Sequence, residues 1–237
     1  MRTAATVALA AVLPLSAPAA AETSAGAPTM LPIDAAVAAL QTADESRTGY
    51  SRTAFRHWTS GDNASDGCNT RQEVLLAEAV TAPKVGPQCA ITGGTWFSYY
   101  DEVTVDGARG LDIDHMVPLA EAWDSGASAW TAARREAYAN DQGQPASLVA
   151  VTARTNRSKS DQDPAEWLPP APGALCRYGA EWTATKLRWN LTIDEQEKTA
   201  LLDIASSCAD TTVTYTPAPP PPPPPQVKPP GRDPAPG

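Results

Sequence analysis

Two short segments of this sequence carry side chains that could do chemistry together: Asp112 to Leu119 and Asn156 to Asp161. Asp114 and Asn156 offer carboxylate and amide oxygens, hard ligands that suit Mg²⁺, with Mn²⁺ as a second choice. His115 follows Asp114 directly, and an imidazole, which ordinarily titrates near neutrality, can take a proton from water. One hydrated divalent cation beside such a base is the equipment for hydrolysing a phosphodiester bond.

Two strands and a helix must position these groups. Aliphatic and acidic residues alternate over 111–114, which predicts a strand with Asp112 and Asp114 on the face opposite the aliphatic side chains. The apolar run 148–152 predicts a second strand, and a helix over about 154–161 would then carry Asn156. We therefore expect a hairpin and a helix to hold the cation between them.

The rest of the chain predicts a single α+β domain that is mostly helical. For the last helix we expect a capping box from Thr192 to Glu195, with Cys208 on the buried face. The other elements that we expect are helices over 35–40, 70–80 and 120–139 and a strand over 96–100.

The two ends differ in composition from the middle. Residues 1–21 have a positive start, a short apolar run and small residues before Glu22, as in a secretory signal peptide. Proline dominates the other end and predicts a disordered, extended tail over 210–237. Between them we expect a helical lead-in, 22–49, and the main domain, 50–209. No later segment is apolar for long enough to span a membrane, so we predict a secreted, extracellular monomer.

The four cysteines predict disulfides rather than zinc, because the chain contains no C-x-x-C pair and reads as exported. Three connectivities are possible. We favour Cys68–Cys89 and Cys176–Cys208, since each joins sequence neighbours and staples one end of the domain.

The formal net charge of −9 argues against a broadly basic surface that would attract a polyanion at long range. Contact with nucleic acid would then depend on a local basic cluster and on the cation. Arg157 and Lys159 lie on the same predicted helix as Asn156, and we expect both to bind phosphate.

Together these segments resemble an HNH endonuclease of the ββα-metal superfamily. More closely, the chain from about Tyr50 to Cys208 resembles the secreted actinobacterial HNH nucleases and the C-terminal HNH domain of GmrSD-type restriction enzymes. The segments that carry this resemblance, besides 112–119 and 148–161, are 67–71, 139–141 and 163–169.

The resemblance implies hydrolysis that leaves a 5′-phosphate, with His115 as the base and Asp114 and Asn156 as ligands of one cation. The substrate would be DNA, cut with little sequence preference, and RNA stays open as a second substrate. In this family a further Asn before the second strand orients the base through its carbonyl. Ser147 occupies that position here, so either Asn140 or Ser147 would orient His115.

Other interpretations stay open. Asp112 would either support the metal site from behind or only cap its strand. Asp62, Asp66 and Glu73 echo a calcium-binding loop, although Ala64 replaces one ligand, so the segment is more simply a turn. The whole chain could also be a non-catalytic wall-associated or ion-binding secreted protein, or a phosphoesterase for small nucleotides.

Overall fold

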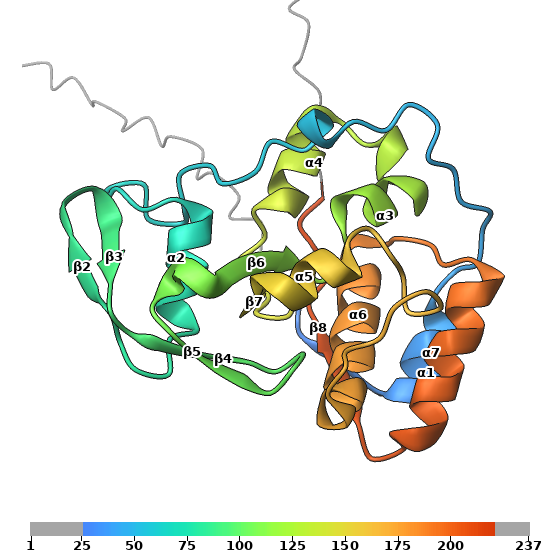
Figure 1. Cartoon of the computed structure of the whole chain (residues 1–237). Helices are drawn as coiled ribbons and strands as arrows, with labels where there is room; N and C mark the ends of the chain where they lie inside the picture. The colour runs from blue at the N-terminus through green and yellow to red at the C-terminus, as the bar shows by residue number, and fades with distance from the viewer. Residues whose placement is uncertain (1–25, 221–237) are drawn as a thin grey trace, which may run out of the picture.

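A hairpin and a helix form the centre of the fold. The computed structural model describes residues 26–220, so the expected signal peptide and most of the proline-rich tail lie outside the described residues. Strand β6 (Leu111–His115) pairs antiparallel with β7 (Leu148–Thr152), and His115 lies opposite Leu148. Helix α5 (Ala153–Lys159) follows β7 directly (Figure 1). The predicted strand–strand–helix order is therefore present.

Helices cover one side of this central unit (Figure 1). The fully buried Tyr178 and Trp182 of α6 contribute to the main hydrophobic core, together with Val37 of α1 and Ile204 of α7. The helices of this part of the molecule are α1 (Ile33–Ala39), α3 (Leu119–Asp124), α4 (Ala132–Ala139), α6 (Leu175–Trp189) and α7 (Glu195–Ser207).

Helix α2 and two hairpins lie on the other side, around a second, smaller core (Figure 1). Trp96 is fully buried there and its indole Nε1 donates to the Leu75 carbonyl at 2.7 Å. The elements are α2 (Thr70–Ala77), the hairpin β2 (Lys84–Gly86) with β3 (Ala90–Thr92), and the hairpin β4 (Thr95–Ser98) with β5 (Val103–Asp106).

Side chains close the outer edge of β7. The Ala150 amide donates to the Glu78 carboxylate at 2.7 Å, and the Thr152 amide donates to the Ser98 hydroxyl at 3.0 Å. Because buried amides need acceptors, these two contacts allow β6 and β7 to remain a two-stranded sheet inside the domain.

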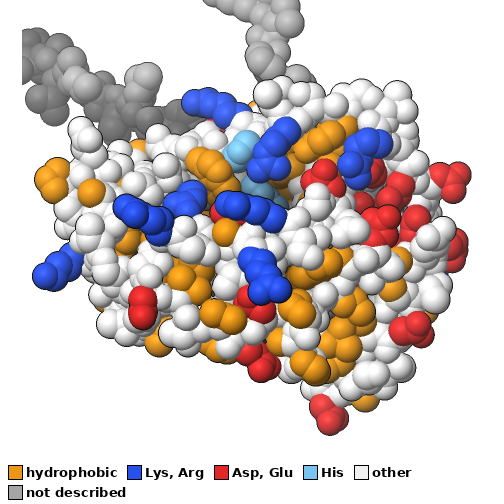
Figure 2. All heavy atoms as spheres, viewed as in Figure 1, with side chains coloured by type: hydrophobic (Ala, Val, Ile, Leu, Met, Phe, Trp, Pro, Cys, Tyr) orange, Lys and Arg blue, Asp and Glu red, His pale blue; other side chains and the backbone are white. Residues whose placement is uncertain are grey.

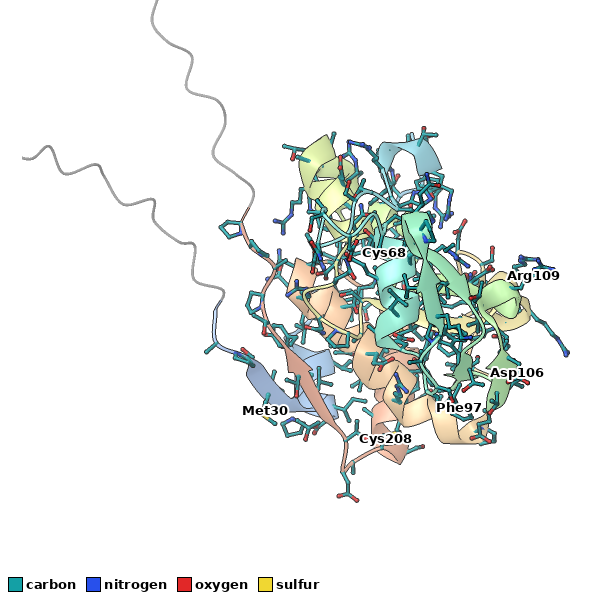
Figure 3. The ribbon with its side chains drawn as sticks, turned by 90° about the vertical axis from the view of Figure 1, so that its left-hand side faces the viewer. Met30, Cys68, Phe97, Asp106, Arg109 and Cys208 are labelled. Atoms are coloured by element: carbon teal, nitrogen blue, oxygen red, sulfur yellow. A yellow bond between two sulfur atoms is a disulfide. The ribbon has the colours of Figure 1, made fainter. Side chains whose placement is uncertain are left out.

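Both predicted disulfides are confirmed. Cys68 bonds to Cys89, and Cys176 bonds to Cys208. The first bridge joins the segment before α2 to the β2–β3 hairpin, and the second joins α6 to the end of α7. Figure 3 labels one cysteine of each bridge, and the two lie in different parts of the domain.

Several predicted elements differ from the observed ones. The helix expected over 120–139 is broken between α3 and α4, where Gly126 has a φ of 116°. The 15-residue helix α6 was not predicted. Helix α7 is capped by Asp194, which accepts from the Glu197 amide at 2.7 Å, and not by the expected box that starts at Thr192.

The expected tail boundary at residue 210 also lies too early. Strand β8 (Thr212–Tyr215) pairs antiparallel with β1 (Thr29–Pro32), so both ends of the described chain meet in one small sheet. Among the described residues no helix has the length and apolar character needed to cross a membrane.

Candidate active site

A cavity of about 380 Å³ lies where β6 ends and α5 packs against it. Asp114, His115 and Asn156 all line it, so the structure brings together the three side chains that the sequence singled out. Its other lining residues are Arg52, Ile113, Pro118, Leu119, Arg157, Ser160 and Asp161. Figure 2 shows Lys and Arg side chains gathered around the histidines at the centre of this face, while acidic side chains gather to its right.

The imidazole of His115 is held in one orientation. Its Nε2 lies 2.9 Å from the Ala139 carbonyl oxygen, and because a carbonyl only accepts, Nε2 carries the proton. Nδ1 is then the nitrogen with a free lone pair. Trp58 stacks on the ring, with centroids 5.3 Å apart and an interplanar angle of 28°.

Burial keeps this imidazole neutral. It lowers the pKa of His115 to about 3, aided by the positive charges of Arg52 and Lys159 and by His57, and opposed by the bond to the Ala139 carbonyl. At neutral pH the ring is therefore uncharged and the lone pair of Nδ1 is free.

Asp114 presents one carboxylate oxygen to buried donors. Its Oδ2 accepts from the Tyr100 hydroxyl at 2.7 Å and from the Lys159 ammonium at 2.5 Å. Within the described residues Oδ1 accepts no hydrogen bond, and the residue lines the cavity. Burial raises the pKa of Asp114, against the opposing effects of Lys159 and Tyr100.

Lys159 does not lie where phosphate binding requires. Its side chain is 0% exposed, and its ammonium donates to Asp114 and to the backbone carbonyls of His115 and Met116. Burial lowers the pKa of Lys159, while Asp114 opposes that effect. The prediction that Lys159 binds phosphate directly is therefore wrong, because the helix register turns this side chain into the core.

Asn156 and Arg157 share one carboxylate. The Asn156 amide nitrogen lies 3.3 Å from Asp112 Oδ2, and the Arg157 Nε lies 3.4 Å from the same oxygen. The amide nitrogen of Asn156 thus faces Asp112, and its amide oxygen has no donor among the described residues. Arg157 is 76% exposed on its side-chain atoms, so it can reach a ligand in the cavity. Asp112 thus contacts two residues that line the cavity.

Neither residue expected to orient His115 contacts it. The Asn140 amide nitrogen donates to the carbonyls of Arg56 and Glu136, and its oxygen accepts from the Thr59 amide. Asn140 therefore fixes the segment that carries Trp58. Ser147 donates to Asp141 at 2.6 Å. The neighbouring backbone carbonyl of Ala139 makes the orienting contact instead. Every residue type has such a carbonyl, so the sequence could not indicate this contact.

The loop that echoed a calcium site is organised around Glu73. This carboxylate accepts from the backbone amides of Asp62 and Asn63, at 2.7 and 3.1 Å, and from Gln142. Asp66 accepts from the Cys68 amide at 2.7 Å. The structure thus uses Glu73 and Asp66 to close a turn.

Sequence reasoning missed four residues of the site. Arg52 and Asp161 line the cavity, Trp58 stacks on His115, and Tyr100 donates to Asp114. Of these four, Asp161 could have been predicted from the sequence, because it ends the segment that begins at Asn156. The other three come from distant parts of the chain that only the fold brings together.

Comparisons with known proteins identify the family of the chain. The family model described as GmrSD restriction endonucleases, C-terminal domain, matches residues 62–204. An uncharacterized secreted protein of Arthroderma benhamiae is 42% identical over 160 residues, which are 68% of this chain and 76% of that protein. No solved structure matches the chain. The matched range covers more than half of the sequence, and with Asp114, His115 and Asn156 inside it, the chain belongs to the family of the GmrSD restriction endonuclease C-terminal domain.

Proposed function

We propose that this protein is a secreted HNH-type endonuclease that hydrolyses phosphodiester bonds of DNA with little sequence preference, using one divalent cation. The observation that carries the proposal is the shared cavity, in which a neutral imidazole faces the same space as a carboxylate and an amide. Membership in a restriction-endonuclease domain family supports nuclease chemistry.

The donor set fits a hard cation. Asp114 Oδ1 and the amide oxygen of Asn156 would hold Mg²⁺ or Mn²⁺, with water as the remaining ligands. Such an ion supplies Lewis-acid stabilisation of the charge on the phosphoryl oxygens and on the leaving 3′ oxygen.

The residues of the chain supply the other parts of the reaction. Nδ1 of His115 takes the proton from the attacking water, and the Ala139 carbonyl keeps the ring in the required tautomer. The guanidinium groups of Arg52 and Arg157 bind phosphate oxygens at the cavity rim. Lys159 acts indirectly, because it fixes the carboxylate of Asp114.

The proposal of secretion has three supports. The first 21 residues have the composition of a signal peptide, both disulfides suit an oxidising compartment, and the Arthroderma benhamiae relative is described as secreted.

The test is cleavage of supercoiled plasmid by the purified, oxidised protein in Mg²⁺ or Mn²⁺. We expect nicking followed by a smear, and loss of cleavage in a chelated sample. His115→Ala should lower the initial rate on the order of 10²- to 10⁴-fold, as removal of a general base does. Asp203→Asn, an exposed carboxylate on α7 that does not line the cavity, is the control, and it should stay within about tenfold of the native rate.

Two outcomes would overturn the proposal. A folded native protein that cuts neither DNA nor RNA would favour a non-catalytic, ion-binding protein. Faster hydrolysis of mononucleotide esters than of the polymer would favour a small-nucleotide phosphoesterase.

A further inference from the structure

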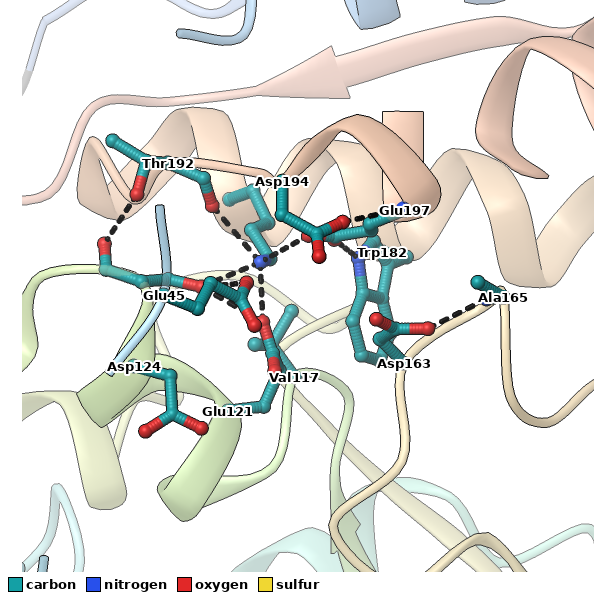
Figure 4. Close-up of polar contacts among 12 residues, drawn as sticks. Glu45, Val117, Glu121, Asp124, Asp163, Ala165, Trp182, Thr192, Asp194 and Glu197 are labelled. Atoms are coloured by element: carbon teal, nitrogen blue, oxygen red, sulfur yellow. Dashed lines mark hydrogen bonds and ion pairs between the residues drawn. The ribbon is translucent and has the colours of Figure 1, made fainter. Parts of the chain in front are cut away.

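A second group of oxygen ligands lies outside the candidate active site. Carboxylate oxygens of Glu45, Glu121 and Asp124 all lie within 4.8 Å of one another. None of the three lines the cavity around His115. Figure 4 labels the three side chains, which lie near one another. Glu121 and Asp124 are one turn apart on α3, and Glu45 belongs to the loop that follows α1. Residues 76 positions apart in sequence thus converge on one point.

The positive charges nearby are already engaged. Lys186 is fully buried, and its ammonium donates to Glu121 Oε1 at 2.6 Å, to Glu197 at 2.8 Å, to the Ser125 hydroxyl and to the Thr192 carbonyl. An ammonium has three protons, so this one has none left for Glu45 or Asp124.

The carboxylate of Asp124 points to a bound ligand. Its side chain is only 6% exposed, and its Oδ2 accepts from Arg47 at 2.6 Å. Its other oxygen, Oδ1, is buried and has no hydrogen-bond partner within residues 26–220. A buried, unpartnered carboxylate oxygen is costly, and bound cations are one of the ways in which proteins offset that cost.

We propose that Glu45, Glu121 and Asp124 bind a hard divalent cation of the Ca²⁺ class. Oxygens that bind one Ca²⁺ at its usual 2.3–2.6 Å can lie at most about 5 Å apart, so the observed spacing is within the reach of one ion. Mg²⁺ demands shorter bonds and a stricter octahedron, which makes the larger ion the better fit.

The ion would fasten the loop after α1 to α3. Two contacts already join this loop to α3 and its surroundings. Trp123 Nε1 donates to the Thr48 carbonyl at 3.2 Å. Arg47 pairs with Asp124 and with Asp161, and Asp161 lines the cavity. The site is therefore structural, and its occupancy stabilises one wall of the candidate active site.

The experiment is a Ca²⁺ titration of the full, oxidised protein after chelation and dialysis, followed by equilibrium dialysis and thermal unfolding. We expect one bound equivalent at Glu45, Glu121 and Asp124, counted apart from Ca²⁺ bound at the candidate active site. At 100 times the dissociation constant the midpoint of unfolding should rise by about 5–10 °C. An equal concentration of Mg²⁺ should raise it less.

Four variants make the result specific. Glu45→Gln and Asp124→Asn keep the side-chain shape but remove a charged ligand, and each should weaken Ca²⁺ binding on the order of tenfold or more. Asp124→Asn also weakens the ion pair with Arg47, whereas Glu45→Gln leaves that pair intact. Glu45→Gln therefore still tests the proposal if Asp124→Asn does not fold. Asp114→Asn, in the candidate active site, and Asp203→Asn, exposed on α7, should keep the bound equivalent.

The proposal is overturned if the native protein binds no Ca²⁺, or if the bound equivalent disappears in Asp114→Asn. It is also overturned if both folded variants, Glu45→Gln and Asp124→Asn, bind Ca²⁺ as the native protein does. A shared proton between the carboxyl groups would then hold the cluster together. Each of these readouts is independent of DNA cleavage.

Discussion

The ammonium of Lys159 lies 2.5 Å from Oδ2 of Asp114, on a side chain that is fully buried. The rings of Tyr100, Tyr178 and Trp182 surround it at 5.5 to 6.0 Å from their centroids. The same nitrogen donates to the carbonyls of His115 and Met116. One buried cation thus fixes a candidate ligand and the backbone of the candidate base.

Lys159→Met should lower the free energy of unfolding by about 3–5 kcal/mol, because it leaves the buried carboxylate of Asp114 without its cationic partner. Urea denaturation measures this change. The matched control is Lys84→Met, an exposed lysine on β2, which should change it by less than about 0.5 kcal/mol. A variant with unchanged stability and a raised KM for DNA would instead mean that Lys159 binds phosphate.

Arg52→Ala and Arg157→Ala should each weaken DNA binding without unfolding the protein. Both line the cavity, and Arg157 is largely exposed, so little packing is lost. Each phosphate contact removed should reduce the slope of log affinity against log salt concentration by about 1. The measurement is binding between roughly 50 and 200 mM salt, with Lys84→Ala as the control. Slopes equal to that of the native protein would exclude both arginines from phosphate contact.

Asn140→Ala should reduce stability more than it reduces cleavage. The Asn140 side chain makes four hydrogen bonds, two to the segment around Thr59, one to Thr70 and one to Glu136, and none of them to His115. We expect a loss of about 1–3 kcal/mol and, at a temperature where the variant is folded, cleavage within about tenfold of native. Asn156→Ala should reduce cleavage more than it reduces stability, because the side-chain amide of Asn156 makes one long hydrogen bond, to Asp112. A cleavage loss of 10²-fold or more in folded Asn140→Ala would make Asn140 a direct participant.

The sequence was informative where one residue type and one local pattern decide the structure. Alternation over 111–114 and the apolar run 148–152 predicted β6 and β7, and His115 with Asp114 and Asn156 did line one cavity. Cysteine pairing between sequence neighbours was also correct.

It was uninformative where tertiary contacts decide. Helix α6 was missed because nearly all of its faces are buried, including Lys186 and Arg188, so it lacks the polar stripe of a surface helix. The burial of Lys159 depends on Tyr178 and Trp182 of that same helix. The carbonyl that orients His115 belongs to Ala139, whose side chain has no part in the contact.

Glu78 should make the stability of the protein depend on pH. Burial raises the pKa of Glu78 from 4.5 to about 7, although the bond from the Ala150 amide and the charge of Arg177 oppose this. Because the folded-state pKa is the higher one, the stabilisation is complete below about pH 4.5 and is lost as the pH rises through 7. By pH 8 this one group should cost roughly 3 kcal/mol.

Glu78→Gln isolates the effect, because the glutamine oxygen can still accept from the Ala150 amide at the edge of β7. The variant should match the native protein near pH 4 and exceed it in stability at pH 8, as measured by urea denaturation across that range. Glu195→Gln, an exposed carboxylate at the start of α7, controls for a general change in net charge. Parallel stability curves for the native protein and Glu78→Gln would show that Glu78 is already ionised in the fold, and that the edge of β7 accepts a charged carboxylate without cost.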